Sequence, residues 1–111
     1  GPFMILVEYD IAEADVPEGS RAGMIAAGTA MVTASRQEAG CLGYDYAWDV
    51  IEPNVMRIRE LWADEAALRF HFKTPHMAAF LATLRADRAV KTKITVYEAG
   101  NPHDIGKYAV A

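Results

Sequence analysis

The chain has 111 residues, of which 52% are hydrophobic, and its formal net charge at pH 7 is −4. This length and composition predict one domain with a real core and exclude a chain that is disordered throughout. The acidic balance argues against nucleic acid and anionic membranes as partners, and no apolar run reaches the roughly 18 residues of a membrane span. The single cysteine, Cys41, permits no internal disulfide. We therefore expect a cytoplasmic protein.

The two ends of the chain are expected to lie outside the domain. A Gly-Pro dipeptide precedes a candidate initiator, Met4, so residues 1–3 look like the remnant of a cleaved tag. This start lacks the basic flank and the long apolar region of a secretory signal peptide. The domain is predicted over residues 4–99, followed by a C-terminal tail over residues 100–111.

Hydrophobic periodicity predicts the first two elements. Apolar and polar residues alternate over residues 3–11, which predicts a strand that ends in a loop. Over about residues 20–39 the apolar residues recur at helical spacing. Gly23 and Gly28 each lower the helix propensity by about 1 kcal/mol relative to Ala, so close neighbours are expected beside them. Gly40 is expected to end the helix as its C′ residue.

Two further strands, over residues 41–51 and 55–63, are predicted to form a hairpin. An odd-numbered turn that pairs Ile51 with Val55 would gather the large aromatic side chains of both strands on one face. Arg59 is expected to form an ion pair on the other face. The predicted pairs are Trp48 with Ile58, Tyr46 with Glu60, Tyr44 with Trp62 and, on the other face, Asp49 with Arg57.

A pair of helices and a last strand complete the predicted order. Asp64 is a good N-cap for a short helix over about residues 65–73, with Phe72 on its inner face. Thr74 as N-cap and Pro75 as first residue then begin a second helix. The apolar stripe of this helix consists of Met77, Phe80, Leu81 and Leu84, and a strand follows over residues 89–99, with Ile94 and Val96 facing inward.

The order strand, helix, strand, strand, helix pair, strand predicts the α+β class. It is the ferredoxin-like split β-α-β plan, with a four-stranded antiparallel sheet and the helices on one face. The uncovered face of such a sheet has to meet solvent or a partner. A homodimer in which two sheets pack face to face is the simplest solution.

Four motifs in the middle of the chain carry a resemblance. They are Glu38-Ala-Gly-Cys-Leu-Gly-Tyr44, Glu60-Leu-Trp62-Ala-Asp-Glu65, His71, and Thr74-Pro-His76-Met-Ala-Ala-Phe80. In this order and spacing, over residues 4–99, the chain resembles the antibiotic biosynthesis monooxygenase family. The resemblance implies a dimeric α/β barrel, in which two ferredoxin-like protomers share a barrel and each holds a pocket between its sheet and its helices.

The resemblance also implies a range of activities, because the family includes cofactor-free oxygenases of phenols and quinols, heme-degrading enzymes and a signal-molecule isomerase. In the heme-degrading branch an asparagine on the first strand, a tryptophan on the third and a histidine on the last helix act together. Only Trp62 matches here, since Tyr9 and Leu81 occupy the other two places. Heme degradation is therefore disfavoured.

Two of the three histidines are candidates for chemistry. His76 lies near the start of a helix, where the positive end of the dipole favours a neutral imidazole. It is either a polar residue that forms hydrogen bonds at the start of the helix or a general base. We assign it the catalytic role of the base. His71 lies near a helix end, which favours its protonated form, and is expected to pair with a carboxylate or border the pocket. Because Pro75 separates them, the two histidines do not form a one-face helical pair, and no metal site is predicted. His103, in the tail, is expected to be solvated.

The aromatic side chains of the hairpin are either core or the walls of a pocket for a flat substrate. Glu60 shares their face in the predicted register, and a buried carboxylate there would bond either to a neighbouring side chain or to a substrate hydroxyl. The residues predicted to bind substrate are Tyr9, Tyr44, Tyr46, Trp48, Glu60, Trp62, His71, Phe72, Met77 and Phe80.

The function that the residues and the resemblance favour is a cofactor-independent monooxygenase. Its expected substrate is an electron-rich phenol, quinol or polyketide-like aromatic, with dioxygen as co-substrate and neither cofactor nor metal. His76 would remove a hydroxyl proton from the ring. Two alternatives stay open: an isomerase of a small hydroxy-ketone that uses His76 with Glu60, and a non-enzymatic dimeric ligand-binding protein.

Overall fold

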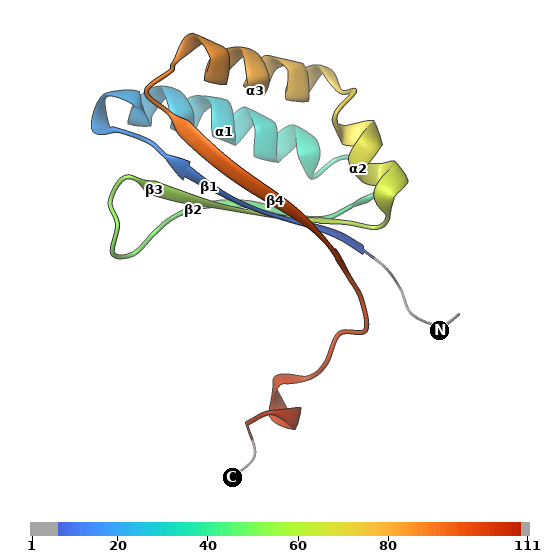
Figure 1. Ribbon diagram of the computed structural model, residues 1–111. Helices are drawn as coiled ribbons and strands as arrows, with labels where there is room; N and C mark the ends of the chain where they lie inside the picture. Colours follow the sequence, from blue (N-terminus) through green and yellow to red (C-terminus); the bar gives the residue numbers. More distant parts are fainter. Residues whose placement is uncertain (1–6, 110–111) are drawn as a thin grey trace.

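The computed structural model describes residues 7–109, and the side chains of residues 13–109. It has two layers, an antiparallel four-stranded sheet and a layer of helices on one of its faces (Figure 1). The strand order is β2-β3-β1-β4, so the predicted α+β, ferredoxin-like split β-α-β fold is confirmed. The elements are β1 (Val7–Asp15), η1 (Glu18–Ser20), α1 (Arg21–Ser35), β2 (Cys41–Trp48), β3 (Val55–Trp62), α2 (Glu65–His71), α3 (Pro75–Ala86), β4 (Lys91–Ala99) and η2 (Ile105–Lys107).

The first strand continues past its predicted end at residue 11. In the described structure β1 runs to Asp15, which pairs with Val55 of β3 on one side and Lys91 of β4 on the other. A strand held by two neighbours stays in the sheet even where its own residues have weak strand propensity. The predicted beginning of this strand, at residues 3–6, lies outside the described residues.

The register of the β2–β3 hairpin differs from the predicted one by two residues, since Trp48 pairs with Met56 and not with Ile58. Asp49 leaves the strand, and its carboxylate accepts hydrogen bonds from the backbone N–H groups of Ile51 (2.9 Å) and Glu52 (2.6 Å). The connection is therefore longer than the predicted turn. From Gly43 to Trp48 a shift of two residues keeps every side chain on its face, so there the predicted partners are wrong and the predicted faces are correct. An irregularity between Cys41 and Gly43 changes the register before it, so the predicted faces do not hold at Cys41 and Leu42.

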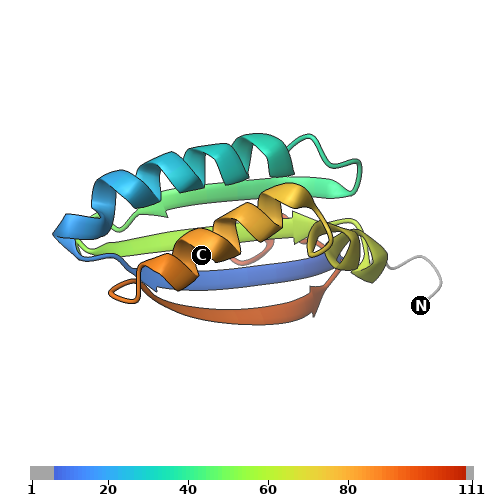
Figure 2. The same ribbon diagram turned by 90° about the horizontal axis from the view of Figure 1, so that it is seen from above.

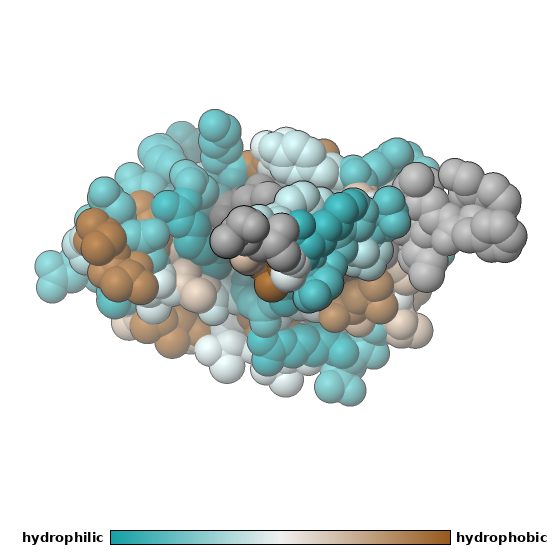
Figure 3. Space-filling model, turned by 90° about the horizontal axis from the view of Figure 1, so that it is seen from below, coloured by the Kyte–Doolittle hydropathy of each residue, from teal (hydrophilic) through white to brown (hydrophobic). Residues whose placement is uncertain are grey.

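The face of the sheet opposite the helices carries ion pairs. Arg57 contacts Asp49 at 3.3 Å and also pairs with Glu13, while Arg59 contacts Asp45 at 2.5 Å. The Asp49–Arg57 pair thus forms although the two residues are not directly opposite each other in the ladder. Seen from this side, hydrophilic residues cover much of the surface between separate hydrophobic patches (Figure 3).

Strand β4 forms an edge of the sheet that the helices leave uncovered. Figure 2 shows α1 above β2 and α3 above the middle of the sheet, while β4 runs outside them. Ile94 and Val96, predicted to face inward, are therefore 55% and 47% exposed. The residues after β4 lead away from the domain (Figure 1), and His103 in this tail is exposed as predicted. No helix within residues 7–109 is long and apolar enough to cross a membrane.

Gly40 lies where an added side chain would collide with another element, and Gly28 lies where one would fit tightly. A Cβ atom added to Gly28 would lie 3.0 Å from the ring of Tyr46, which is the predicted close neighbour, whereas one added to Gly23 would meet nothing within 4 Å. Gly40 does not have the positive φ of a C′ residue, so that prediction is wrong. It is needed because an added Cβ would lie 2.3 Å from the Cβ of Ala67 in α2.

Replacing Gly40 by alanine is expected to lower the free energy of unfolding by about 1–3 kcal/mol, the usual loss from overpacking. The control is Gly23→Ala, which has free space around it and is expected to raise that free energy by up to about 1 kcal/mol through helix propensity. Urea denaturation of both variants at one protein concentration measures the difference. Equal stability of the Gly40→Ala variant and the wild type would contradict the close contact with α2.

Candidate functional site

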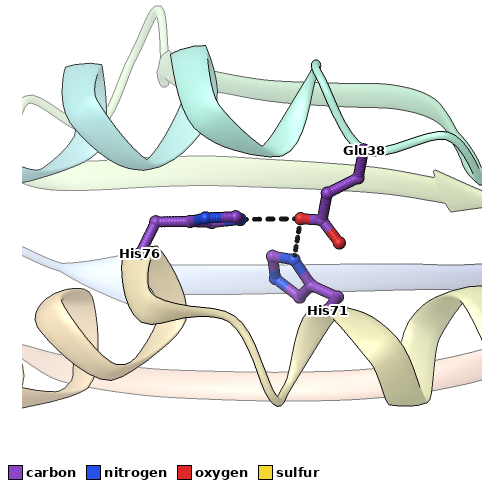
Figure 4. Close-up of side chains that lie close together, drawn as sticks. All are labelled: Glu38, His71 and His76. Carbon is purple, nitrogen blue, oxygen red and sulfur yellow. Dashed lines mark hydrogen bonds and ion pairs between the residues drawn. The ribbon is translucent and has the colours of Figure 1, made fainter.

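Three polar side chains from separate segments meet between the helices and the sheet (Figure 4). Glu38 lies in the loop between α1 and β2, His71 is the last residue of α2, and His76 is the second residue of α3. Oε2 of Glu38 is 2.7 Å from Nδ1 of His71 and 2.7 Å from Nε2 of His76. Because a carboxylate only accepts hydrogen bonds, the nitrogen that faces it on each ring carries a proton in this arrangement.

The joint between α2 and α3 brings the two histidines together. The Thr74 hydroxyl accepts a hydrogen bond from the backbone N–H of Met77 (3.2 Å) and donates one to the carbonyl oxygen of His71 (2.7 Å). This confirms Thr74 as the N-cap of α3, with Pro75 as its first residue. The ring centroids of His71 and His76 are consequently only 5.8 Å apart.

The loop that carries Glu38 is fixed against the start of α2. The carbonyl oxygen of Gly40 accepts a hydrogen bond from the backbone N–H of Ala63 (2.9 Å), directly before the N-cap Asp64. Asp64 caps α2 as predicted, accepting from the N–H of Ala67 at 2.8 Å. The absent side chain of Gly40 lets the loop approach α2 closely enough for Glu38 to reach both histidines.

Burial controls the protonation of the first histidine. The side chain of His71 is 2% exposed and that of Glu38 is 6% exposed, against 21% for His76. Burial lowers the pKa of His71, and the adjacent Glu38 carboxylate only partly offsets this. The predicted preference for the protonated form is therefore wrong, because loss of solvent outweighs the dipole of a short helix. The predicted pairing of His71 with a carboxylate is confirmed.

Beneath His71 lies a second buried polar group, Glu60, which is 5% exposed. Its Oε1 accepts a hydrogen bond from the indole N–H of Trp62 at 3.1 Å and is 4.0 Å from Nε2 of His71. The Trp62 ring, fully buried, lies 4.5 Å from the His71 ring between centroids. Burial also raises the pKa of Tyr44, so this side chain stays a neutral phenol in the same cluster.

A pocket of about 540 Å³ borders this cluster on the outside. Glu38 and His76 form its polar wall. The remaining lining residues are Ala34, Gln37, Ala39, Gly40, Ala67, Phe70 and Thr74. Small side chains with one aromatic ring give a surface on which a flat apolar molecule can lie beside the imidazole.

Of the predicted site residues whose side chains the structure describes, only His76 lines this pocket. Trp62, Tyr44 and Glu60 adjoin His71 in the core, behind the pocket. The pocket therefore lies between the α1–β2 loop and the α2–α3 joint, and not between the sheet aromatics and the last helix as predicted. Met77 and Phe80 are buried core residues, with the Phe80 ring 5.8 Å from that of Tyr46.

Three other predicted residues lie elsewhere. Tyr46 and Trp48 line a separate groove of about 310 Å³ along α1, and the guanidinium of Arg21 lies 3.9 Å from the centre of the Trp48 ring. Phe72 is 53% exposed and borders a hollow with Val96 of β4, so it is not on the inner face of α2. The side chain of Tyr9 lies outside the described residues.

Sequence reasoning missed Glu38 and Phe70. Glu38 opens the first motif, but a lone acidic residue in a loop is usually solvated, so no role was assigned to it. No sequence signal distinguishes Glu38 from a solvated loop residue, because the close approach of Gly40 to Ala67 that positions it is seen only in the structure.

Comparison with known proteins agrees with the fold and with the position of the motifs. The fold and the histidine cluster define a small ferredoxin-like α+β protein with a pocket next to an imidazole–carboxylate pair. The model of the family described as antibiotic biosynthesis monooxygenase matches residues 9–83. The chain belongs to this antibiotic biosynthesis monooxygenase family.

Two curated relatives match parts of the chain. It is 32% identical over 74 residues to the uncharacterized protein sll1783 of Synechocystis, and 42% identical over 52 residues to the Bacillus subtilis protein named "Putative monooxygenase YcnE". These matches cover 67% and 47% of this chain, and 50% and 55% of the relatives, so the chain matches about half the length of each.

Solved structures cover more of the chain. A Deinococcus radiodurans protein described as a "putative antibiotic biosynthesis monooxygenase" superposes with a TM-score of 0.82 at 27% identity, over 88% of this chain and 97% of that one. PA3566 of Pseudomonas aeruginosa superposes with a TM-score of 0.72 at 32% identity, over 84% and 93%.

Proposed function

We propose that this protein is a cofactor-independent monooxygenase that oxidises an electron-rich phenol or quinol with dioxygen. The observation that carries the proposal is the hydrogen bond between Nε2 of His76 and Oε2 of Glu38 in the wall of a pocket. A carboxylate that orients an imidazole and stabilises its protonated form is the usual support of a histidine base. The name of YcnE supports the same reaction class.

The Glu38–His76 pair would act on the substrate hydroxyl. When the neutral His76 ring donates its Nε2–H to Glu38, its Nδ1 carries no proton. Nδ1 would then take the hydroxyl proton of the bound ring. The phenolate would then transfer one electron to dioxygen, and the phenoxyl radical and superoxide would combine at a ring carbon. Loss of water from the resulting peroxide gives the quinone, so that phenol plus dioxygen yields quinone plus one water.

The pocket lining suits an aromatic substrate. Ala39, Gly40 and Ala67 offer a flat, apolar surface, and Phe70 offers a ring for stacking. The pocket volume of about 540 Å³ is in the range of small-molecule sites. Polar contact comes from the carboxylate–imidazole pair, which would place a hydroxyl group, and not the ring, next to His76.

The proposed assembly is a homodimer. The helices leave β4 uncovered, where Ile94, Val96 and Tyr97 are all about half exposed. A second copy that packs against this uncovered edge strand would remove such apolar surface from water.

An isomerase of a small hydroxy-ketone is the second candidate, because the same base could move a proton next to a carbonyl. The pair favoured for this chemistry is Glu38 with His76. Glu60, predicted as the second group, contacts Trp62 and lies nearer to His71. An isomerase would exchange a substrate α-proton with solvent under nitrogen.

Oxygen uptake tests the proposed function. Metal-free wild-type protein is given a panel of hydroquinones in an oxygen electrode, beside the His76→Ala variant, and autoxidation is removed by taking the difference between the two. Uptake that depends on His76 and yields a hydroxylated quinone supports the monooxygenase. Uptake no faster than in buffer, together with anaerobic proton exchange, would favour the isomerase. Ligand affinity without either reaction would favour a binding protein.

A further inference from the structure

We propose that Glu38, His71 and His76 form a binding site for a divalent first-row transition metal ion, with Zn²⁺ as the reference ion. Each residue offers one ligand atom, and these atoms lie within 4.8 Å of one another. Two imidazole nitrogens and one carboxylate oxygen are a ligand set that Zn²⁺ and its neighbours bind in open, three-residue sites. The proposal goes beyond the proposed function, for which no ion is needed; an ion on Nε2 of His76 would leave the proton on Nδ1, so the metal-bound form and the base are alternative states of this side chain.

The first supporting observation is an unpaired oxygen. Oε1 of Glu38 is buried and has no hydrogen-bond partner within the described part of the chain, and the whole side chain is only 6% exposed. A buried carboxylate oxygen without a partner is unfavourable and marks the place of a missing water or ion. A cation bound at Oε2 would neutralise the carboxylate to which this unpaired oxygen belongs.

The second observation is the carboxylate behind His71. If Nδ1 of His71 carries the proton that Glu38 accepts, Nε2 presents a lone pair toward Oε1 of Glu60, 4.0 Å away. Two acceptors then face each other. With a metal ion on Nδ1 the proton moves to Nε2, which can donate toward Glu60. A histidine that binds a metal usually donates its other ring N–H to a carboxylate or a similar acceptor. Glu60 would be that acceptor for His71.

The side chain of Glu60 is itself held in place by a neighbouring residue. Its Oε1 accepts the Trp62 indole N–H at 3.1 Å, and the indole ring packs on His71. The ligand deepest in the core, His71, is therefore fixed in position by neighbours on two sides. His76, at the pocket and 21% exposed, is the ligand that can adjust.

The distances allow an ion after small side-chain movements. Tetrahedral Zn²⁺ with bonds of about 2.1 Å keeps its ligand atoms about 3.4 Å apart. The two contacts of 2.7 Å to Oε2 of Glu38 would lengthen, and the two nitrogens, now up to 4.8 Å apart, would approach each other. Since Glu38 and His76 also line the pocket, a fourth position would face it and take water.

Titration of metal-stripped protein with Zn²⁺, followed by calorimetry, tests this site. We expect one ion per chain, and at least about 10–100-fold weaker binding in Glu38→Gln and in His76→Gln, because even changes outside the ligand set cause losses of that size. His103→Gln, in the exposed tail, is the matched control and should bind like the wild type. Absence of stoichiometric binding, or binding lost only in His103→Gln, would overturn the proposal.

A second measurement on the wild type does not depend on the folding of variants. In nitrogen-15 NMR of the histidine side chains, Zn²⁺ should shift Nδ1 of His71 and Nε2 of His76 and move the proton of His71 to Nε2. A shift confined to His103 would overturn the proposal. Neither measurement uses substrate or dioxygen, so failure of the monooxygenase proposal and failure of the metal site are separate results.

Discussion

Replacement of His76 by glutamine is expected to lower kcat for oxygen-dependent oxidation of a hydroquinone by about 10²–10⁴-fold, the usual contribution of a general base. Glutamine has a similar length, and its amide can still donate to Oε2 of Glu38, so the loop and α3 should keep their positions. What the variant lacks is a nitrogen that can take a proton. Steady-state oxygen uptake with chelator present, corrected for autoxidation, measures the loss.

Two further variants show whether this loss belongs to the base. Glu38→Gln should cause a smaller loss of kcat, because Glu38 acts only through the orientation and charge of His76. His103→Gln should leave kcat unchanged, since His103 lies in the exposed tail and bonds to Tyr108. A His76→Gln variant with the kcat of the wild type would contradict the role of His76 as the general base.

Replacement of Trp62 by alanine is expected to lower the free energy of unfolding by about 3–5 kcal/mol, the range for a large aromatic residue in a core. The Trp62 ring is fully buried and contacts His71 and Tyr44, and its N–H bonds to the buried Glu60. Alanine would leave both a cavity and a carboxylate oxygen with one donor fewer. Urea denaturation at fixed protein concentration measures the change.

Trp48→Ala is the matched control for this prediction. Trp48 is half-buried at the groove along α1, under the guanidinium of Arg21, so a clearly smaller loss is expected. Trp62→Phe should give an intermediate loss, because it keeps one aromatic ring in the core and removes the hydrogen bond to Glu60. A loss below about 1 kcal/mol in Trp62→Ala, no more than an exposed site produces, would mean that Trp62 is a pocket wall and not core.

The sequence predicted those parts of the fold that depend on neighbouring residues. The alternation of apolar and polar residues placed Tyr44, Glu60 and Trp62 on one face, because successive side chains in a strand point to opposite faces of the sheet. The caps at Asp64 and Thr74 were predictable because a cap bonds to a backbone group three residues further on.

The parts that failed depend on contacts between distant residues. The predicted hairpin register was wrong because the Asp49 carboxylate accepts hydrogen bonds from its own loop and so lengthens the connection. The alternation of apolar and polar residues does not predict the length of a loop. The candidate site was only half predicted, since Glu38 reaches His76 through the approach of its loop to α2. That approach depends on a contact between Gly40 and Ala67. These two residues are far apart in the sequence, and no pattern in it predicts that they meet.

The exposed edge strand β4 also has a consequence for the solubility of the chain. An unpaired edge can add a strand from another molecule, and Ile94, Val96 and Tyr97 would make such an addition favourable. Lys91 and Lys93 oppose it, because charges along an edge repel a second copy in the same alignment. The segment most available for ordered assembly is thus also the one most liable to aggregate, and these two lysines are its protection while it is unpaired.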